Sequence, residues 1–119
     1  MALSALIRDL ESKGLLDQTL IVLATEFGRT PDINENAGRD HHPGVFSGLM
    51  CGAGIQRGAV YGTSDTRGST PDEDGVGVED FNATIARAMG LPLEQEFFAP
   101  NGRPFHICNE GKPITKLLA

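Results

Sequence analysis

The residues best suited to chemistry gather in one polar stretch, residues 25–43. Glu26 comes directly after an apolar segment, and the run Asp40, His41 and His42 lies near the end of the stretch. Neutral imidazole is the commonest protein metal ligand near neutral pH, and zinc accepts carboxylate oxygen together with His nitrogen. This stretch is therefore a candidate for a divalent metal site, with Glu26 and His41 as the ligands.

Both candidate ligands also have structural interpretations. Adjacent histidines in a polar loop commonly face solvent or bond to the backbone, and consecutive side chains diverge, so we expect only one of His41 and His42 to point into a site. The other would contact the substrate or support the ligand. Glu26 has an equally good interpretation as a strand-end carboxylate that pairs with Arg29 or Arg39.

Two arginines in the same stretch, Arg29 and Arg39, suit an anionic ligand. The planar guanidinium binds phosphate, sulfate or carboxylate through two parallel hydrogen bonds. We interpret Arg29, Arg39, Asp40 and His42 as candidate contacts to a small anionic ester or anion. The alternative, which we favour slightly for Arg29, is a solvated side chain or an ion pair that fixes the loop.

Motifs for other chemistries are missing from the sequence. It contains no GxSxG elbow, and no serine has an evident paired base, so no catalytic residue is assigned. The run Gly52-Ala53-Gly54 matches neither phosphate-binding glycine motif and is better explained as a turn. Cys51 and Cys108 lack CxxC spacing, so we expect two buried, reduced thiols, with a disulfide as the alternative.

The elements that position the polar stretch follow from hydrophobic periodicity. Leu3, Leu6, Ile7 and Leu10 have helical spacing, which predicts an amphipathic helix that ends at Gly14. The run 19–24 is almost wholly apolar, and such continuity is typical of a parallel strand covered on both faces. The sequence thus predicts an α/β fold, with a small, mostly parallel sheet and flanking helices.

Further elements are expected after the polar stretch. The sequence predicts strands at 45–51, 59–61 and 104–108, and a solvated loop at 63–75 rich in turn residues. A helix is expected from Glu79 or Asp80 to Gly90, with Phe81, Ile85 and Met89 as its apolar stripe.

Composition narrows the range of partners. Ten basic residues against sixteen acidic ones give a net charge of −6, which argues against a nucleic-acid partner. The longest apolar run is far shorter than the roughly 20 residues that span a bilayer, so no membrane partner is expected. No signal peptide opens the chain, and the sequence does not indicate the compartment.

Three motifs together resemble a known family. They are Thr25-Glu26-Phe27-Gly28-Arg29-Thr30-Pro31, Gly38-Arg39-Asp40-His41 and Gly52-Ala53-Gly54-Ile55. They are similar to the C-terminal portion of the sulfatase-like family called domain of unknown function 1501, in the alkaline-phosphatase superfamily. The resemblance implies that residues 1–119 form a single domain, part of an α/β/α sandwich that hydrolyses sulfate or phosphate esters with metal ions beyond the strand ends.

The resemblance also implies departures from the superfamily. Glu26 and Phe27 stand where its members carry an Asp-His pair, so one imidazole ligand is lost. His41 matches the later metal histidine, with His42 as the alternative. In place of a two-zinc site we expect a single ion, or an oxygen-rich calcium or magnesium site. Because only the C-terminal end is matched, we expect the nucleophile half to be missing, no turnover by this chain alone, and a homo-oligomer or a separate N-terminal half. The alternative is a small non-enzymatic module that binds an anion or a partner.

Overall fold

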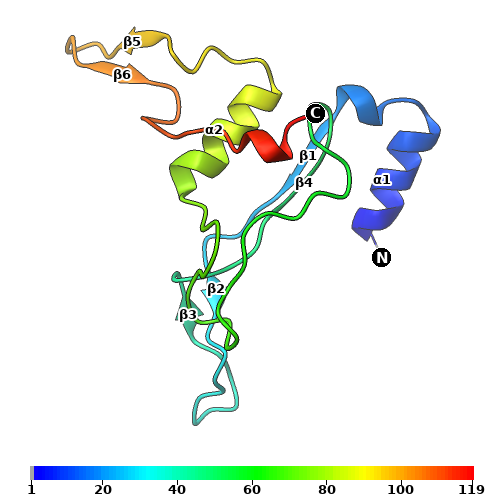
Figure 1. The fold of residues 1–119 in the computed structure, drawn as a ribbon, viewed down its shortest axis with the longest axis vertical. Coiled ribbons are helices and arrows are strands. Elements are labelled where there is room, and N and C mark those ends of the chain that lie inside the picture. Colours follow the sequence, from blue (N-terminus) through cyan, green and yellow to red (C-terminus); the bar gives the residue numbers. More distant parts are fainter. Residues whose placement is uncertain (1) are drawn as a thin grey trace. The chain divides into compact units, whose positions relative to one another are not determined.

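The computed structural model describes residues 2–119, and short elements alternate in it with long irregular segments. In chain order the elements are α1 (Ala2–Ser12), a 3₁₀ turn η1 (Leu16–Gln18), β1 (Leu20–Leu23), β2 (Gly28–Arg29), β3 (His41–His42), β4 (Leu49–Gly52), α2 (Val78–Ala88), β5 (Glu96–Phe98), β6 (Pro104–His106) and a second 3₁₀ turn η2 (Thr115–Leu117) (Figure 1).

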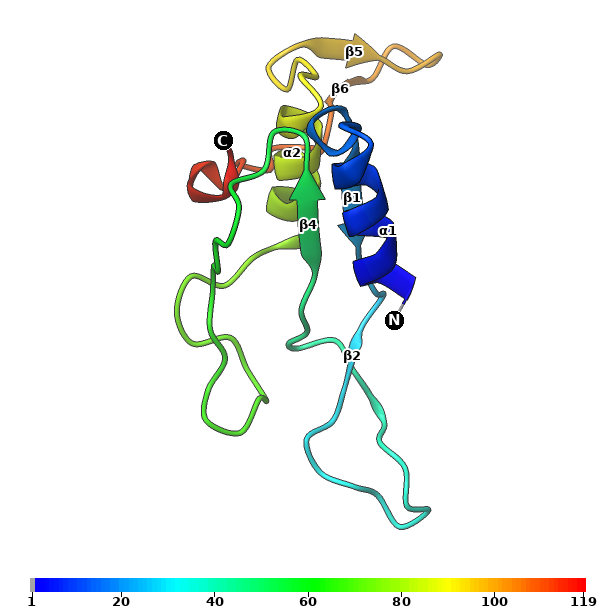
Figure 2. The ribbon, with the colours of Figure 1, turned by 90° about the vertical axis from the view of Figure 1, so that its right-hand side faces the viewer.

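The strands form three separate two-stranded sheets: β1 with β4, β2 with β3, and β5 with β6. The β2–β3 and β5–β6 pairs are antiparallel, and the arrows of β1 and β4 also point in opposite directions (Figure 2). The mixed α/β class is confirmed, but the expected mostly parallel sheet is wrong. A parallel strand needs cover on both faces, whereas Val22 and Leu23 of β1 are 37% and 51% exposed.

The described chain divides into two compact units. The first comprises residues 2–21, 51–59 and 77–119, and the second comprises residues 22–50 and 60–76. The hydrophobic residues that are buried in the described chain all belong to the first unit; they are Leu16, Ile55, Ala83, Ala86, Leu93 and Ile114. The second unit is organised by hydrogen bonds and by the ion pair of Arg67 with Asp32 instead.

Helix α2 is the centre of the first unit. Its expected position is confirmed, and Glu79 and Asp80 in its first turn complement the helix dipole. The expected apolar stripe is partly wrong, because Met89 is 62% exposed while the small residues Ala83 and Ala86 are buried against Leu93. Small side chains allow the following segment to approach the helix closely.

A buried hydroxyl joins the C-terminal tail to α2. Thr84 is fully buried, and its Oγ1 donates to the carbonyl of Asp80 at 2.7 Å while accepting the N–H of Ile114 at 2.9 Å. The Asp80 carboxylate accepts the N–H of Lys112 at 2.7 Å. The tail therefore lies along the helix through directional bonds as well as apolar contact.

Helix α1 agrees with the sequence in position but not in burial. It ends at Ser12, and Gly14 has the positive φ (67°) that is typical of a residue just past a helix end. None of its residues is buried, and Leu6 is 47% exposed. No helix in residues 2–119 has both the length and the apolar character needed to cross a bilayer.

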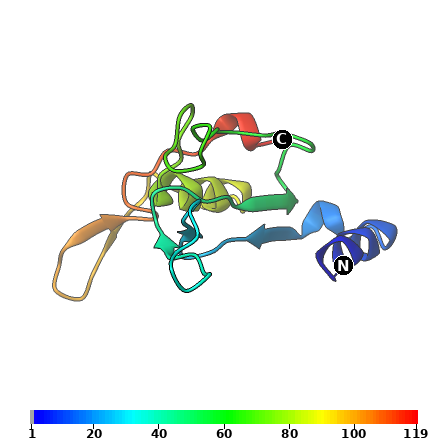
Figure 3. The same ribbon diagram turned by 90° about the horizontal axis from the view of Figure 1, so that it is seen from below.

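The β5–β6 hairpin was only half expected. Its second strand lies within the predicted 104–108 segment, whereas β5 was not predicted. Phe97 pairs with Phe105 across the strands, and their rings stack with centroids 5.9 Å apart. Figure 3 shows the hairpin projecting away from α2. The expected strand at 59–61 does not form, and Val60 in it is 92% exposed.

Candidate functional site

The candidate residues lie in the second unit, on and around the β2–β3 ribbon. This antiparallel ribbon pairs Gly28 with His42 and Arg29 with His41. Since successive side chains of a strand point to opposite faces, Arg29 and His41 share one face and His42 lies on the other. The two adjacent histidines therefore have different surroundings.

One face of the ribbon combines an arginine with two stacked rings. The rings of Phe27 and His41 stack with centroids 3.9 Å apart, and the guanidinium carbon of Arg29 lies 5.8 Å from the centre of the Phe27 ring. Arg29 and His41 are exposed. We call Phe27, Arg29 and His41 the front face; it presents N–H donors to solvent.

The two predicted anion-binding arginines are held by carbonyl groups of the same loop. Arg29 donates from Nη1 to the carbonyl of Arg39 at 3.2 Å. Arg39 in turn donates from Nη1 to the carbonyl of Thr30 at 2.7 Å and to that of Pro31. A guanidinium has five N–H donors, so these bonds orient both side chains and still allow Arg29 to contact an anion.

His42 connects the other face of the ribbon to a second segment. Its ring is half-buried, and Nε2 lies 2.7 Å from the carbonyl oxygen of Ser69. A carbonyl only accepts, so Nε2 carries the proton and donates. A Cβ on Gly44 would lie 3.2 Å from the His42 ring, so the glycine gives the ring its space.

Ser69 belongs to a hairpin that the sequence predicted as a solvated loop. Backbone bonds from Thr63 to Glu73 and from Asp65 to Thr70 close residues 63–73 into what we call the 63–73 hairpin. The carboxylate of Asp65 accepts the N–H groups of Ser69 at 2.6 Å and Thr70 at 3.2 Å. These two backbone hydrogen bonds, that of Ser69 first, lower the pKa of the Asp65 carboxyl below its usual value.

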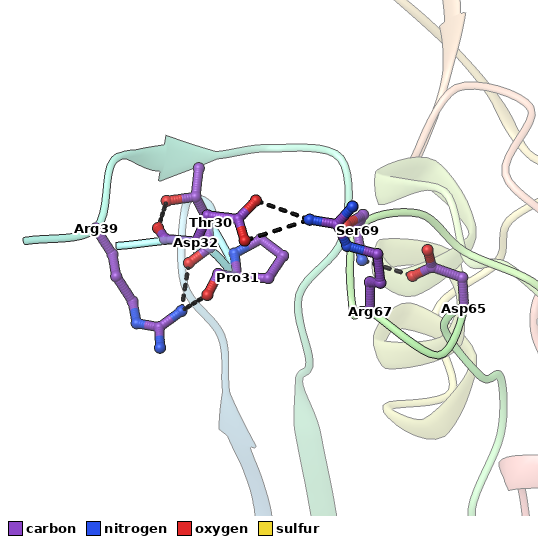
Figure 4. A network of polar contacts seen from close by, with 7 residues as sticks. All are labelled: Thr30, Pro31, Asp32, Arg39, Asp65, Arg67 and Ser69. Atoms are coloured by element: carbon purple, nitrogen blue, oxygen red, sulfur yellow. Dashed lines mark hydrogen bonds and ion pairs between the residues drawn. The ribbon is translucent and has the colours of Figure 1, made fainter. Parts of the chain in front are cut away.

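The tip of this hairpin also reaches the 25–43 loop. Arg67 donates from Nη2 to both carboxylate oxygens of Asp32, at 2.9 and 3.2 Å (Figure 4). Arg67 and Asp32 were not predicted from the sequence. Nothing in the sequence indicates that an arginine in one polar loop faces an aspartate in another. The turn itself had a signal, because an Asp followed within a few residues by Gly, Ser and Thr favours local side-chain-to-backbone bonds.

The remaining predicted residues shape the loop or face solvent. The carboxylate of Asp40 accepts a hydrogen bond from the side-chain amide of Asn34 at 2.9 Å, and its backbone N–H donates to the Thr30 hydroxyl. Glu26 is exposed at the bend after β1. Within residues 2–119, no group of three or more His, Cys, Asp or Glu side chains is arranged to hold a metal ion. A role for Glu26 and His41 as two metal ligands stays a prediction.

A hollow of about 810 Å³ in the first unit is a less suitable place for an anion. Its charged lining consists of Glu79, Asp80, Glu110 and Arg103. The three carboxylates outnumber the one guanidinium and repel an anionic ligand. None of the site residues predicted from the sequence lines this hollow. The front face is therefore the better candidate despite its open shape.

The comparisons with known proteins show the family of this chain. A sequence model of the family described as "Protein of unknown function (DUF1501)" matches residues 1–118. The chain belongs to this family, as its motifs had indicated. Neither the curated proteins nor the solved structures contain a match to it.

Proposed function

We propose that this chain supplies the anion-binding surface of an enzyme that hydrolyses sulfate or phosphate esters. The front face would contact the anionic group of the ester. The observation that carries this proposal is the direct pairing of Arg29 with His41, which sets two exposed N–H donors side by side on one face. The sulfatase-like resemblance of the 25–41 segment supports the choice of an ester as the ligand.

Each residue of the front face has a distinct task in this proposal. Arg29 supplies the positive charge and a planar pair of donors, and its bond to the Arg39 carbonyl limits its motion. His41 supplies a ring N–H, and its stacking on Phe27 fixes the orientation of the imidazole. Arg39 and Asp40 hold the loop in shape, and in this proposal they act on the anion indirectly.

The proposal does not assign the whole reaction to this chain. The described residues do not form a complete metal site, and no serine was paired with a base. We therefore expect no hydrolysis of an aryl sulfate or aryl phosphate by the purified chain above the buffer rate. Robust turnover would contradict this division of the reaction, because it would require a nucleophile that we have not assigned.

A second candidate is a non-enzymatic module that binds an anion or an anionic partner through the same face. The lack of a three-residue metal-ligand group within residues 2–119 favours it. The two candidates differ in their dependence on metal ions. Tighter sulfate binding in the presence of zinc, calcium or magnesium favours the hydrolase, and sulfate binding that ignores all three favours the module.

The front face is tested by calorimetric titration with inorganic sulfate and phosphate. Hydrogen bonds to charged groups contribute about 1.5–3 kcal/mol, and 1.4 kcal/mol is about tenfold in affinity. Because the face is exposed, we expect Arg29→Gln and His41→Gln each to weaken binding by about tenfold. Arg8→Gln removes the same charge from an exposed position on α1 and is the matched control. Equal affinities for Arg29→Gln and Arg8→Gln would overturn the proposed site.

A further inference from the structure

The front face is braced by a hairpin that contributes no residue to it. We propose that Asp65 and Arg67 are positioning residues for the anion site and that they act through two separate contacts of the 63–73 hairpin. This inference rests on the proposed function above, since it concerns the same site. It assigns a role to a segment that the sequence predicted only as a solvated loop.

The first contact runs from Asp65 to the strand that carries His41. The Asp65 carboxylate holds the N–H of Ser69 at 2.6 Å, which fixes the hairpin turn around this residue. The carbonyl of Ser69 then accepts the Nε2–H of His42 at 2.7 Å. His42 is the register partner of Gly28, so this bond fixes the backbone of β3 and with it the place of His41.

The second contact runs from Arg67 to the loop that holds Arg29. Arg67 binds both carboxylate oxygens of Asp32. Asp32 directly follows Thr30 and Pro31, whose carbonyls hold the guanidinium of Arg39 (Figure 4). The carbonyl of Arg39 then accepts the hydrogen bond from Arg29. The hairpin thus reaches both members of the Arg29–His41 pair from outside the front face.

The expected loss of sulfate affinity follows from the exposure of the Arg67 and Asp32 side chains. The side chains of Arg67 and Asp32 are 67% and 79% exposed, and exposed ion pairs are individually weak. Their benefit to ligand binding comes from preorganisation, because a loop that is already ordered loses less freedom when the anion binds. We expect removal of either contact to weaken sulfate binding about threefold, less than removal of a front-face residue.

The first test is sulfate titration of Arg67→Gln and Asp65→Ala, which removes the acceptor of the Ser69 and Thr70 N–H groups. Arg57→Gln is a matched control, because Arg57 also forms an exposed ion pair, with Glu11, but in the first unit. We expect Arg67→Gln and Asp65→Ala to weaken binding and Arg57→Gln to leave it within about twofold of wild type. The double variant Asp32→Arg with Arg67→Asp rebuilds the pair in reverse and should recover most of the affinity lost in Arg67→Gln.

A spectroscopic measurement separates this inference from the proposed function. The ¹⁵N shifts of the neutral His42 ring should place its proton on Nε2 in the wild type, and Asp65→Ala should reduce that preference. If the wild type binds no sulfate, the proposed function fails, while the ¹⁵N shifts still test the first contact. If the wild type binds sulfate and both hairpin variants bind it equally well, the positioning role is overturned and the proposed function stands.

Discussion

Arg29 and His41 are direct cross-strand partners in a ribbon that has only two residues per strand. Opposed side chains of an antiparallel pair have their Cβ atoms about 4.5–5.5 Å apart. The spacing of the two N–H donors is therefore set by backbone pairing, and any change that disturbs the ribbon should disturb anion binding.

Gly28 is the position where the ribbon is least tolerant of a side chain. A Cβ there would lie 2.5 Å from the carbonyl oxygen of Val45 and 3.0 Å from the Cβ of Phe46. Overpacking of this kind costs about 1–3 kcal/mol, and here the cost falls on a pairing with few other contacts. We expect Gly28→Ala to abolish the β2–β3 amide exchange protection and to weaken sulfate binding to the level of Arg29→Gln or below.

Gly38→Ala is the matched control for this variant. Gly38 lies in the same loop, but a Cβ at this position would have the Asn34 side-chain oxygen as its nearest neighbour at 3.6 Å, an ordinary contact. The spectrum and the sulfate affinity of this variant should stay close to those of the wild type. If Gly28→Ala behaves like Gly38→Ala, the claim that the Val45 carbonyl lies too close to Gly28 for a side chain is contradicted.

We expect the 63–73 hairpin to be sensitive to acid because of the hydrogen bonds that Asp65 accepts. Its pKa lies below the usual 3.8 because the backbone N–H groups of Ser69 and Thr70 stabilise the carboxylate. A carboxyl with a lowered folded pKa adds stability that is complete above its unfolded pKa and is lost as the pH falls through the folded value. The amide shifts of Ser69 and Thr70 should therefore titrate with a midpoint below 3.8. The same shifts should not titrate in Asp65→Asn, and a midpoint at or above 3.8 in the wild type would contradict the assignment.

We expect that replacement of Thr84 lowers the stability of the first unit. Replacement by Val keeps the shape of the side chain but leaves the buried N–H of Ile114 without its acceptor. A buried unsatisfied donor costs about 1–3 kcal/mol. The free energy of unfolding of the first unit, measured with urea, should therefore fall by that amount. Thr84→Ser keeps the hydroxyl and should lose less stability than Thr84→Val. The reverse order would mean that the methyl group, and not the hydrogen bond, matters at this position.

Metal binding tests whether Glu26 and His41 act as ligands. Structural zinc sites use four protein ligands and catalytic sites use three, so two ligands should give only weak binding. We expect a small zinc heat in calorimetry that is lost in both Glu26→Ala and His41→Ala. His106→Ala, which alters a half-buried histidine of the first unit, should keep it. Zinc binding that survives both substitutions would place the ions elsewhere.

We expect self-association through the apolar side of α1, where Leu6 is exposed and Leu3, Ile7 and Leu10 are half-buried. Exposed apolar patches on a protein surface commonly mark contact surfaces, and Leu6 is 47% exposed in a helix with no buried residue. Light scattering should therefore show a dimer or a larger species that Leu6→Glu reduces. Ala5→Glu adds the same charge at an exposed neighbour and should have the smaller effect. A monomer at high protein concentration would contradict this prediction.

The sequence predicted well those features that depend on neighbouring residues. The position of α1, the glycine after it and the place of α2 follow from helical periodicity and capping. The apolar run of β1 was misleading, because continuous apolarity predicts cover on both faces but does not supply the covering elements. Val22 and Leu23 stay exposed for this reason.

The candidate site was predictable in its residues but not in its contacts. Arg29, His41 and His42 were identified by type and spacing, and the two-residue ribbon then decided which of them share a face. The Asp32–Arg67 and His42–Ser69 contacts join positions 35 and 27 residues apart. No periodic pattern links such positions, so sequence reasoning had no means of pairing them.

The confinement of the buried apolar residues to the first unit has a consequence for experiments on solvent conditions. Added salt screens exposed charges and should weaken the Arg67–Asp32 ion pair of the second unit, while it leaves the buried apolar residues of the first unit in place. Denaturants that solvate apolar groups should act mainly on the first. The two units are therefore best monitored by separate probes.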